Sequence, residues 1–286
     1  KPEEKITRLR AELEKTPAEA RPLLQTILGH WYWQYFRVNR YRFLQRTATA
    51  QPLGDDFTTW DLPRLYREID LHFTNALADG RLKTIPTTDF ADLLTKPTLP
   101  EHYRPTLYDF IAHEALGFYT SGEFSAAKPE DAFEVRVSDP LLGPLDKFLA
   151  WVPETTDTES PQFKAVRLYQ DMLRFHLDDA DSSALNDTDI LRLLHGKRIA
   201  AGDGTNDRFI EAMQSLVERE PGPLSAWARY HWAQTLHADG DSVEARRVAI
   251  AGRDAFPESR GGNRCHNLVA QIEAKSISVE AESVWN

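Results

Sequence analysis

The sequence holds a single cysteine, Cys265, among 286 residues. One thiol excludes an internal disulfide and a metal site built from several cysteines. It does not indicate a cellular compartment, because a lone cysteine is tolerated in both reducing and oxidising surroundings.

Long apolar runs and an excess of basic residues are also missing. No stretch approaches the roughly 18 apolar residues that cross a bilayer, so we predict no transmembrane segment. The first fifteen residues lack the apolar core of a signal peptide, so we expect a targeting segment to be absent or removed. The 44 acidic residues outnumber the 34 basic ones, giving a net charge of −10. This balance argues against a general nucleic-acid-binding protein, which needs Lys and Arg for phosphate contacts.

Segments that alternate apolar and polar residues are nearly absent before residues 277–281, where such a pattern predicts a strand. Elsewhere the apolar residues recur every three or four positions, which is typical of amphipathic helices. Asp61 precedes one such pattern and Ser160 another, and both residue types cap helices. The sequence therefore predicts an all-α fold of antiparallel helix pairs. With 41% hydrophobic residues, the chain is long enough for one large domain or two ordinary ones.

Loop-forming residues divide this helical chain. The segments 95–105, 151–161 and 200–207 are rich in proline, glycine and polar residues, as connecting loops are. We place the principal boundary near residue 155. The predicted organisation is an N-terminal helical subdomain over 1–155 and a helical-hairpin region over 156–275.

Residues 30–46, HWYWQYFRVNRYRFLQR, combine seven aromatic rings with several arginines. Such a stretch could bind single-stranded nucleic acid, lie on a membrane surface, or form a buried helix. Trp31, Tyr35 and Val38 continue an apolar stripe that begins at Leu24 and Leu28, and rings also occupy the remaining faces. This pattern favours a central buried helix, with its arginines paired to acidic residues elsewhere or lying near a helix C-terminus.

Candidate catalytic and metal-binding patterns are incomplete. His113–Glu114 begins a zinc-protease motif, but Gly117 stands where the second histidine belongs. Asp203, Thr205 and Asp207 imitate the start of a calcium loop, but Arg208 replaces its glycine and no closing glutamate follows. We therefore interpret these segments as a polar helix pair and a polar turn.

Cys265 and His266 could suggest a nucleophile and its base, but adjacent helical residues point about 100° apart. A packed cysteine is the favoured interpretation. We predict that the chain is not an enzyme and has no catalytic, cofactor-binding or metal-ligating residues.

The segment 225–259 predicts two helices around a turn at Gly240. Asp241 is placed to cap the second helix, Ala245 allows close packing, and Pro257 follows the helix. These positions fit the turn glycine, small residue and terminal proline of a tetratricopeptide repeat, although Arg229 and Ala249 depart from its aromatic positions. We expect solenoid-like packing of helix pairs toward the C-terminus, which generally presents surfaces to protein partners.

Five long segments resemble the N-terminal helical region of large bacterial alpha-2-macroglobulin-like proteins. In chain order they are WYWQYFRVNRYRFLQRTATA (31–50), DDFTTWDLPRLYREID (55–70), RPTLYDFIAHEALGFY (104–119), SPQFKAVRLYQDMLRFHL (160–177) and CHNLVAQIEAKSISVE (265–280). The resemblance covers nearly the whole chain. In that family, this helical region precedes a string of β-sandwich macroglobulin domains, so residues 276–286 would begin the first of them.

The resemblance implies an exported, cell-envelope or periplasmic protein from a family associated with trapping or inhibiting proteases. The thioester, the bait region and the macroglobulin domains of that family are missing here, and Cys265 is not the thioester residue. We therefore expect a fragment that acts as a non-catalytic scaffold or interaction region. Its partners would be the remainder of its own chain, proteases or envelope proteins. The alternative is an unrelated helical enzyme with a cleft between its two halves, which would show convergent titratable groups in a concave site.

Overall fold

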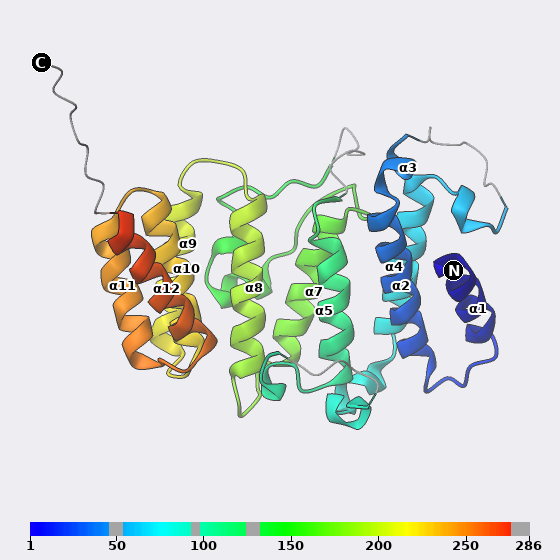
Figure 1. Cartoon of the computed structure of the whole chain (residues 1–286), viewed down its shortest axis with the longest axis horizontal. Coiled ribbons are helices and arrows are strands. Elements are labelled where there is room, and N and C mark those ends of the chain that lie inside the picture. The colour runs from blue at the N-terminus through cyan, green and yellow to red at the C-terminus, as the bar shows by residue number, and fades with distance from the viewer. Residues whose placement is uncertain (46–53, 93–97, 124–131, 276–286) are drawn as a thin grey trace, which may run out of the picture. The chain divides into compact units, whose positions relative to one another are not determined.

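The computed structural model describes residues 1–45, 54–92, 98–123 and 132–275 and is built of helices (Figure 1). In these ranges no β-strand forms, and only two isolated bridges occur, Pro86 with Thr106 and Arg136 with Ala201. The all-α prediction is confirmed over this part of the chain. The strand predicted at 277–281 lies outside the described residues.

Two compact units share the chain. Unit 1 contains residues 1–132 and 156–168, and unit 2 contains residues 133–155 and 169–286. The chain therefore changes unit three times, whereas we predicted one principal boundary near residue 155. Residues 133–155 belong to unit 2 because their contacts are with the helices of that unit. The loop expected over 151–161 is present up to the start of α7 (Pro161–Phe175).

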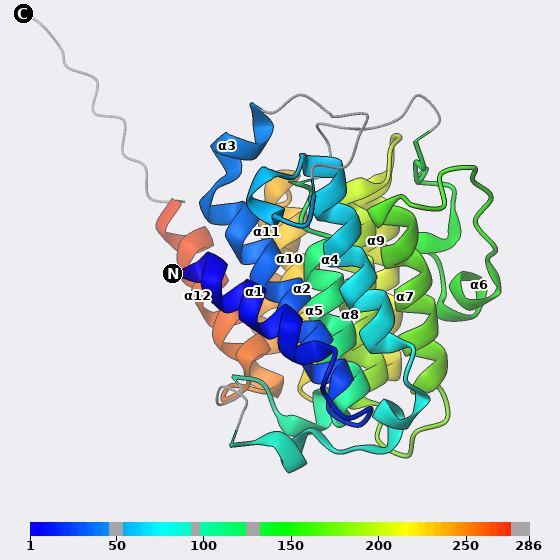
Figure 2. The ribbon, with the colours of Figure 1, turned by 90° about the vertical axis from the view of Figure 1, so that its right-hand side faces the viewer.

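Unit 1 is a group of α-helices joined by short 3-10 turns (Figure 2). Its α-helices are α1 (Pro2–Leu13), α2 (Arg21–Val38), α3 (Arg40–Leu44), α4 (Leu62–Leu77), α5 (Leu107–Tyr119) and the first part of α7, up to Leu168. The 3-10 turns are η1 (Phe57–Thr59), η2 (Gly80–Thr84), η3 (Thr87–Phe90) and η4 (Glu101–Tyr103). Helix α2 packs against α1, α4 and α5. The Asp61 side chain accepts a hydrogen bond from the Arg64 amide at 2.9 Å, as predicted for the cap of α4.

Helix α2 is the central element of unit 1, but its buried face differs from the predicted stripe. Tyr32, Tyr35 and Phe36 are buried, whereas Trp31 is only partly buried and Val38 is 84% exposed. The expectation is confirmed for Tyr35 and wrong for Val38, which is the last residue of the helix. Rings occur on several faces of α2, so their spacing alone did not identify the face that meets α4 and α5.

Unit 2 is built mainly of consecutive α-helices of 14 to 17 residues. After η6 (Pro140–Leu142), α6 (Leu145–Ala150) and the end of α7 come α8 (Ser183–Ile199), α9 (Thr205–Arg219), α10 (Leu224–Ala238), α11 (Ser242–Ala255) and α12 (Arg260–Lys275). Helix α10 packs against both of its chain neighbours, α9 and α11. It also packs against α12 and contacts α8. Consequently α8 and α12 each lie beside α10, although α9 and α11 separate these helices along the chain.

Small residues set the close packing of the last three helices. A Cβ atom at Gly261 would lie 2.2 Å from the backbone nitrogen of Trp227, so α12 approaches the backbone of α10 directly. Gly240 has a φ of +96°, which confirms the turn predicted there, and the Asp241 side chain caps α11 as predicted. Cys265 lies in the core between these helices with Ala233, Ala245 and Ala249.

A buried charge network holds the start of unit 2 to α8. The Arg192 side chain is 1% exposed and donates hydrogen bonds to Asp189 at 2.6 Å and to the Leu141 carbonyl at 2.7 Å. Arg219 of α9 also pairs with Asp189. Burial would raise the pKa of Asp189, but these two guanidinium groups hold it below its usual value. A buried charge that is paired in this way has a structural role.

None of the helices in the described ranges combines the length and the apolar character needed to cross a membrane. This finding agrees with the prediction made from the apolar runs of the sequence.

Candidate functional site

The His113–Glu114 pair lies on α5, which packs against α2. The Glu114 carboxylate lies 2.9 Å from His30 Nδ1 of α2, and Gly117 lies against the ring of Trp33. Within the described ranges, no three His, Cys, Asp or Glu side chains come together to hold a metal ion. Glu114 therefore links α5 to α2, as a polar residue of the pair.

The calcium-like segment is the turn before α9. Gly204 has a φ of +82° and Thr205 Oγ1 donates a hydrogen bond to the Gly202 carbonyl at 2.9 Å. Asp203 and Asp207 are both exposed. The geometry is that of a polar turn that starts a helix.

Cys265 and His266 point to different surroundings, as the helical geometry predicted. The Cys265 thiol is buried and lies 3.5 Å from the Ala226 carbonyl, to which it donates. Burial raises the pKa of this thiol to about 11, so it is protonated at neutral pH. His266 is exposed. The two side chains cannot act as a nucleophile and its base.

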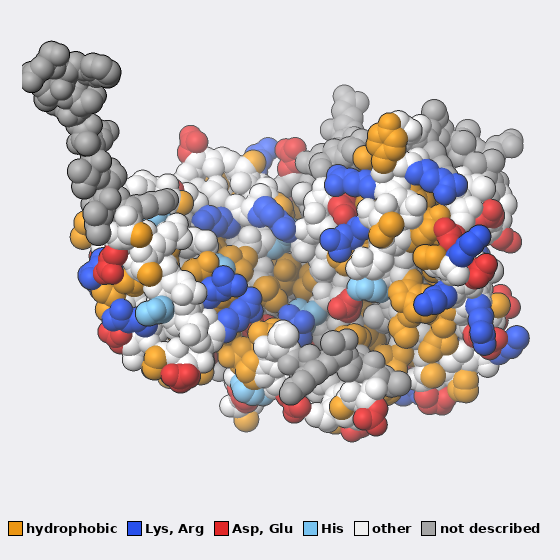
Figure 3. All heavy atoms as spheres, viewed as in Figure 1, with side chains coloured by type: hydrophobic (Ala, Val, Ile, Leu, Met, Phe, Trp, Pro, Cys, Tyr) orange, Lys and Arg blue, Asp and Glu red, His pale blue; other side chains and the backbone are white. Residues whose placement is uncertain are grey.

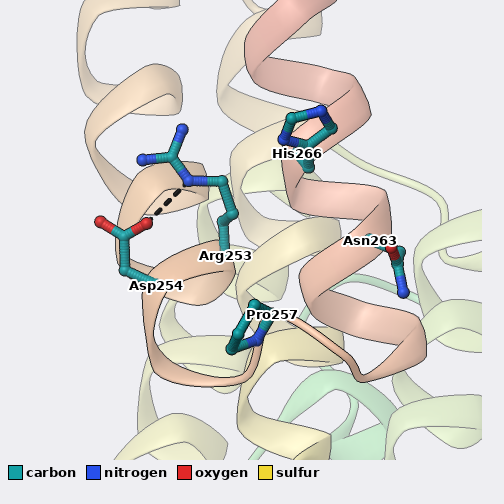
Figure 4. Close-up of a pocket in the computed structure, with 5 residues that line it drawn as sticks. All are labelled: Arg253, Asp254, Pro257, Asn263 and His266. Carbon is teal, nitrogen blue, oxygen red and sulfur yellow. Dashed lines mark hydrogen bonds and ion pairs between the residues drawn. The ribbon is translucent and has the colours of Figure 1, made fainter.

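His266 instead lines an open hollow formed by the end of α11 and the start of α12 (Figure 4). Pro257, Asn263 and the Arg253–Asp254 pair are its other lining residues. Arg253 Nε donates to Asp254 at 2.7 Å, so these two charges compensate each other. The hollow contains no nucleophile, and its charged groups are already paired.

A different surface of unit 2 carries unpaired charge. Residues 221–238, which include the whole of α10, contain no Asp or Glu. The only acidic residue of α12 is Glu273, which pairs with Arg246 of α11 at 2.7 Å. Figure 3 shows Lys and Arg side chains gathered over α8, α10 and α12, with few Asp or Glu side chains among them.

We call the residues Lys197, Trp227, His231, Arg260 and Arg264 the basic face of unit 2. The Arg260 guanidinium lies 4.0 Å from the centre of the Trp227 ring, and that ring meets the His231 ring edge-on at 4.4 Å. Arg264 is four residues after Arg260 and so occupies the same side of α12. Both arginines are exposed.

Lys197 of α8 completes this face from the other side of α10. Its Nζ donates a hydrogen bond to Thr235 Oγ1 at 2.6 Å and lies 4.8 Å from the centre of the Phe209 ring. Partial burial lowers its pKa, and the negative charge of Asp239 acts in the opposite direction without forming an ion pair. Within the described ranges, neither Lys197 nor the two arginines of the basic face has a carboxylate within ion-pair distance.

The cations of this face act on His231. Burial, followed by the charges of Arg260, Lys197 and Arg264, lowers the pKa of His231 to about 3. The imidazole is therefore neutral at pH 7, so it neither adds to nor compensates the positive charge of its neighbours. A carboxylate brought to this face could form ion pairs that no described carboxylate of the chain forms with Lys197, Arg260 or Arg264.

The sequence prediction did not identify Lys197, His231, Arg260 or Arg264. One signal could have indicated this face. In a chain with 44 acidic residues, the segments 221–238 and 260–272 have none. Only the fold shows that both segments, together with the end of α8, meet at one surface.

Comparisons of the chain with protein-family models, with curated proteins and with solved structures gave no match.

Proposed function

We propose that this chain is a non-catalytic helical interaction region whose C-terminal helices pack like tetratricopeptide repeats. The observation that carries the proposal is the arrangement of α8, α10 and α12. Helix α10 packs against α12 and contacts α8, and their surface carries the cations Lys197, Arg260 and Arg264, which have no ion-pair partner among the described residues. Stacked helix pairs generally present such surfaces to protein partners.

The interior of unit 2 also supports a structural rather than a catalytic role. The buried Asp189 is held by Arg192, which also reaches backbone carbonyls, and by Arg219. Its one thiol is protonated at neutral pH. An acid–base site would require titratable groups that converge on a space that a substrate could occupy, and Asp189 and Arg192 converge on each other.

We further propose that this region belongs to an alpha-2-macroglobulin-like protein of the bacterial cell envelope. The support is the resemblance described above. Its segments fall on α2 and α3, on η1 and α4, on α5, on α7 and on α12, which are structural elements of the two units. In such a protein, macroglobulin domains would follow the helical region along the chain.

Translation of the gene on both sides of these 286 codons tests the family assignment. A run of predicted β-sandwich domains after Asn286 would support it. A stop codon directly after Asn286, with no such domains on either side, would contradict it.

A protease assay tests the non-catalytic, non-inhibitory role of the region itself. The 286-residue protein lacks a bait region and a thioester, so it has no means of capturing a protease. We expect proteolysis of a large protein substrate to proceed at the same rate with and without an excess of this chain. Stoichiometric protection of that substrate would contradict the proposal.

A further inference from the structure

The basic face of unit 2 has an electrostatic character opposite to that of the chain as a whole. The chain carries a net charge of −10. Lys197, Arg260 and Arg264 nevertheless share one surface where no carboxylate of the described residues pairs with them. Like charges that gather without counter-ions repel one another, and a ligand of opposite charge relieves this repulsion.

We propose that the basic face binds an extended acidic segment of a partner protein, which rests on the interaction role proposed above and names its partner chemistry. Arg260 and Arg264 are one helical turn apart, so they would pair with neighbouring carboxylates of the segment. Lys197 lies on the other side of α10 and would pair with a carboxylate farther along it. Arginine suits this task because its planar guanidinium binds a carboxylate with two parallel hydrogen bonds.

Polar side chains next to these cations suit the backbone of such a segment. Gln234 of α10 and Asn267 and Gln271 of α12 are exposed. Asn267 and Gln271 follow Arg264 at spacings of three and seven residues, which keeps them on its side of α12. Amide side chains both donate and accept, as the peptide groups of an extended segment require.

A nucleic acid fits this face less well than an acidic peptide. Single-strand binding relies on exposed aromatic rings on which bases stack. Here the Trp227 ring is buried, lies under the Arg260 guanidinium, and stacks on Tyr230 at 5.3 Å. The ring thus positions Arg260 and is not available to a base. Three cations are also few beside the six to ten phosphate contacts, approximately, that strong DNA binding uses.

Fluorescence anisotropy with the full 286-residue protein tests the proposal. The probe is a labelled peptide of about ten residues, or roughly 33 Å when extended, that alternates Glu with Gly. The same peptide with Gln in place of Glu is the uncharged control. We expect the Glu peptide to bind at least about tenfold more tightly than the Gln peptide in low salt, and this preference to shrink as salt screens the charges.

Charge reversal locates the binding. Arg260→Glu with Arg264→Glu should weaken binding of the Glu peptide at least about tenfold. Arg42→Glu in unit 1 changes an exposed arginine within the aromatic stretch and should leave the affinity unchanged. Should the double variant fail to fold by circular dichroism, Arg264→Gln and Lys197→Gln are milder replacements, each expected to weaken binding severalfold.

Three results would overturn the proposal. The first is equal affinity for the Glu and Gln peptides. The second is an equal loss of binding in the Arg42→Glu variant. The third is a labelled oligothymidine of similar length that binds more tightly than the Glu peptide and loses its binding in the Arg260→Glu, Arg264→Glu variant, which would assign the face to nucleic acid. These results concern the basic face alone, so they are distinguishable from a stop codon after Asn286, which would contradict the family assignment.

Discussion

The cores of the two units differ in the size of the side chains that form them. In unit 1, large rings meet edge to face around α2, as in the pair Phe36–Tyr66 at 5.2 Å and the pair Tyr32–Phe57 at 5.2 Å. In unit 2, alanines, glycines and a cysteine let α10, α11 and α12 approach one another closely. Short, irregular connections accompany the rings, and long, regular helices accompany the small residues.

This difference predicts opposite sensitivities to mutation. A core of large rings loses most when a side chain is made smaller, because the cavity that remains cannot fully collapse. Helices in backbone contact lose most when a side chain is made larger, because neither backbone can move away cheaply. We expect the following changes in the free energy of unfolding, in decreasing order, with the pH dependence last. Each is measured by hydrogen exchange in the full chain and read out on peptides from the unit concerned.

The largest effect should come from the charge network of unit 2. Asp189→Ala leaves Arg192 buried without its carboxylate, which should cost about 3–5 kcal/mol. Asp254→Ala breaks the solvent-accessible Arg253–Asp254 pair and should leave the free energy of unfolding of unit 2 unchanged. Equal effects of the two substitutions would show that burial of the network is not what makes it important.

Truncation of a central ring in unit 1 should have a comparable or slightly smaller effect. Phe36 is fully buried on α2, so Phe36→Ala should cost about 3–5 kcal/mol. Tyr41, which is 75% exposed, is the matched control, and Tyr41→Ala should change stability by less than about 0.5 kcal/mol. Trp31→Ala should fall between them, since Trp31 is only partly buried. A neutral Phe36→Ala variant would remove the distinction between the two cores.

Addition of one methyl group should change the free energy of unfolding in opposite directions in the two units. Gly261→Ala places a Cβ against the α10 backbone and should cost about 1–3 kcal/mol. Gly117 of α5 is exposed, and its added Cβ would make only ordinary contact, at 3.6 Å, with Trp33. Gly117→Ala should therefore stabilise unit 1 by about 0.5–1 kcal/mol, because alanine favours a helix. Destabilisation by both substitutions to the same extent would contradict close helix approach as the feature of unit 2.

The last effect is a slope in the pH dependence of stability. Burial, followed by the charge of Arg198, lowers the pKa of His195 in unit 2 from 6.5 to about 3, and Tyr169 also packs beside its ring. The folded pKa is depressed, so the stabilising contribution is present above pH 6.5 and is lost as the pH falls toward 3. His195→Phe should make the decline of unit 2 stability between pH 6.5 and pH 4 shallower.

His72 provides the corresponding measurement in unit 1. Burial, followed by the charge of Arg10, lowers the pKa of His72 to about 4. The stability of unit 1 should therefore also fall as the pH drops below 6.5. This decline should level off near pH 4, a higher pH than for His195. A His195→Phe variant with an unchanged pH profile would show that this imidazole is already hydrated in the folded protein.

Local patterns predicted the helices well because each pattern lies within one helix. The caps of α4 and α11 follow from Asp61 and Asp241, and the turn at Gly240 follows from its place between two helical patterns. The buried side of α2 did not follow. Its rings point in several directions, and only the positions of α4 and α5 decide which of them are covered.

The basic face also depends on tertiary structure. Lys197 and Arg260 are far apart in the sequence, and each alone is an ordinary surface cation. Their proximity follows from the packing of α8 and α12 on the two sides of α10. The unpaired state of these cations is a property of three helices, so no short motif could have revealed it.

The buried Cys265 has a practical consequence for studies of motion in unit 2. Its thiol is covered by α10 and protonated at neutral pH, so a thiol reagent cannot attack it until the helices separate. No other cysteine in the chain competes for the reagent. The rate of labelling in the native protein therefore reports how often α12 detaches from α10, and its dependence on an acidic peptide would show whether occupancy of the basic face locks these two helices together.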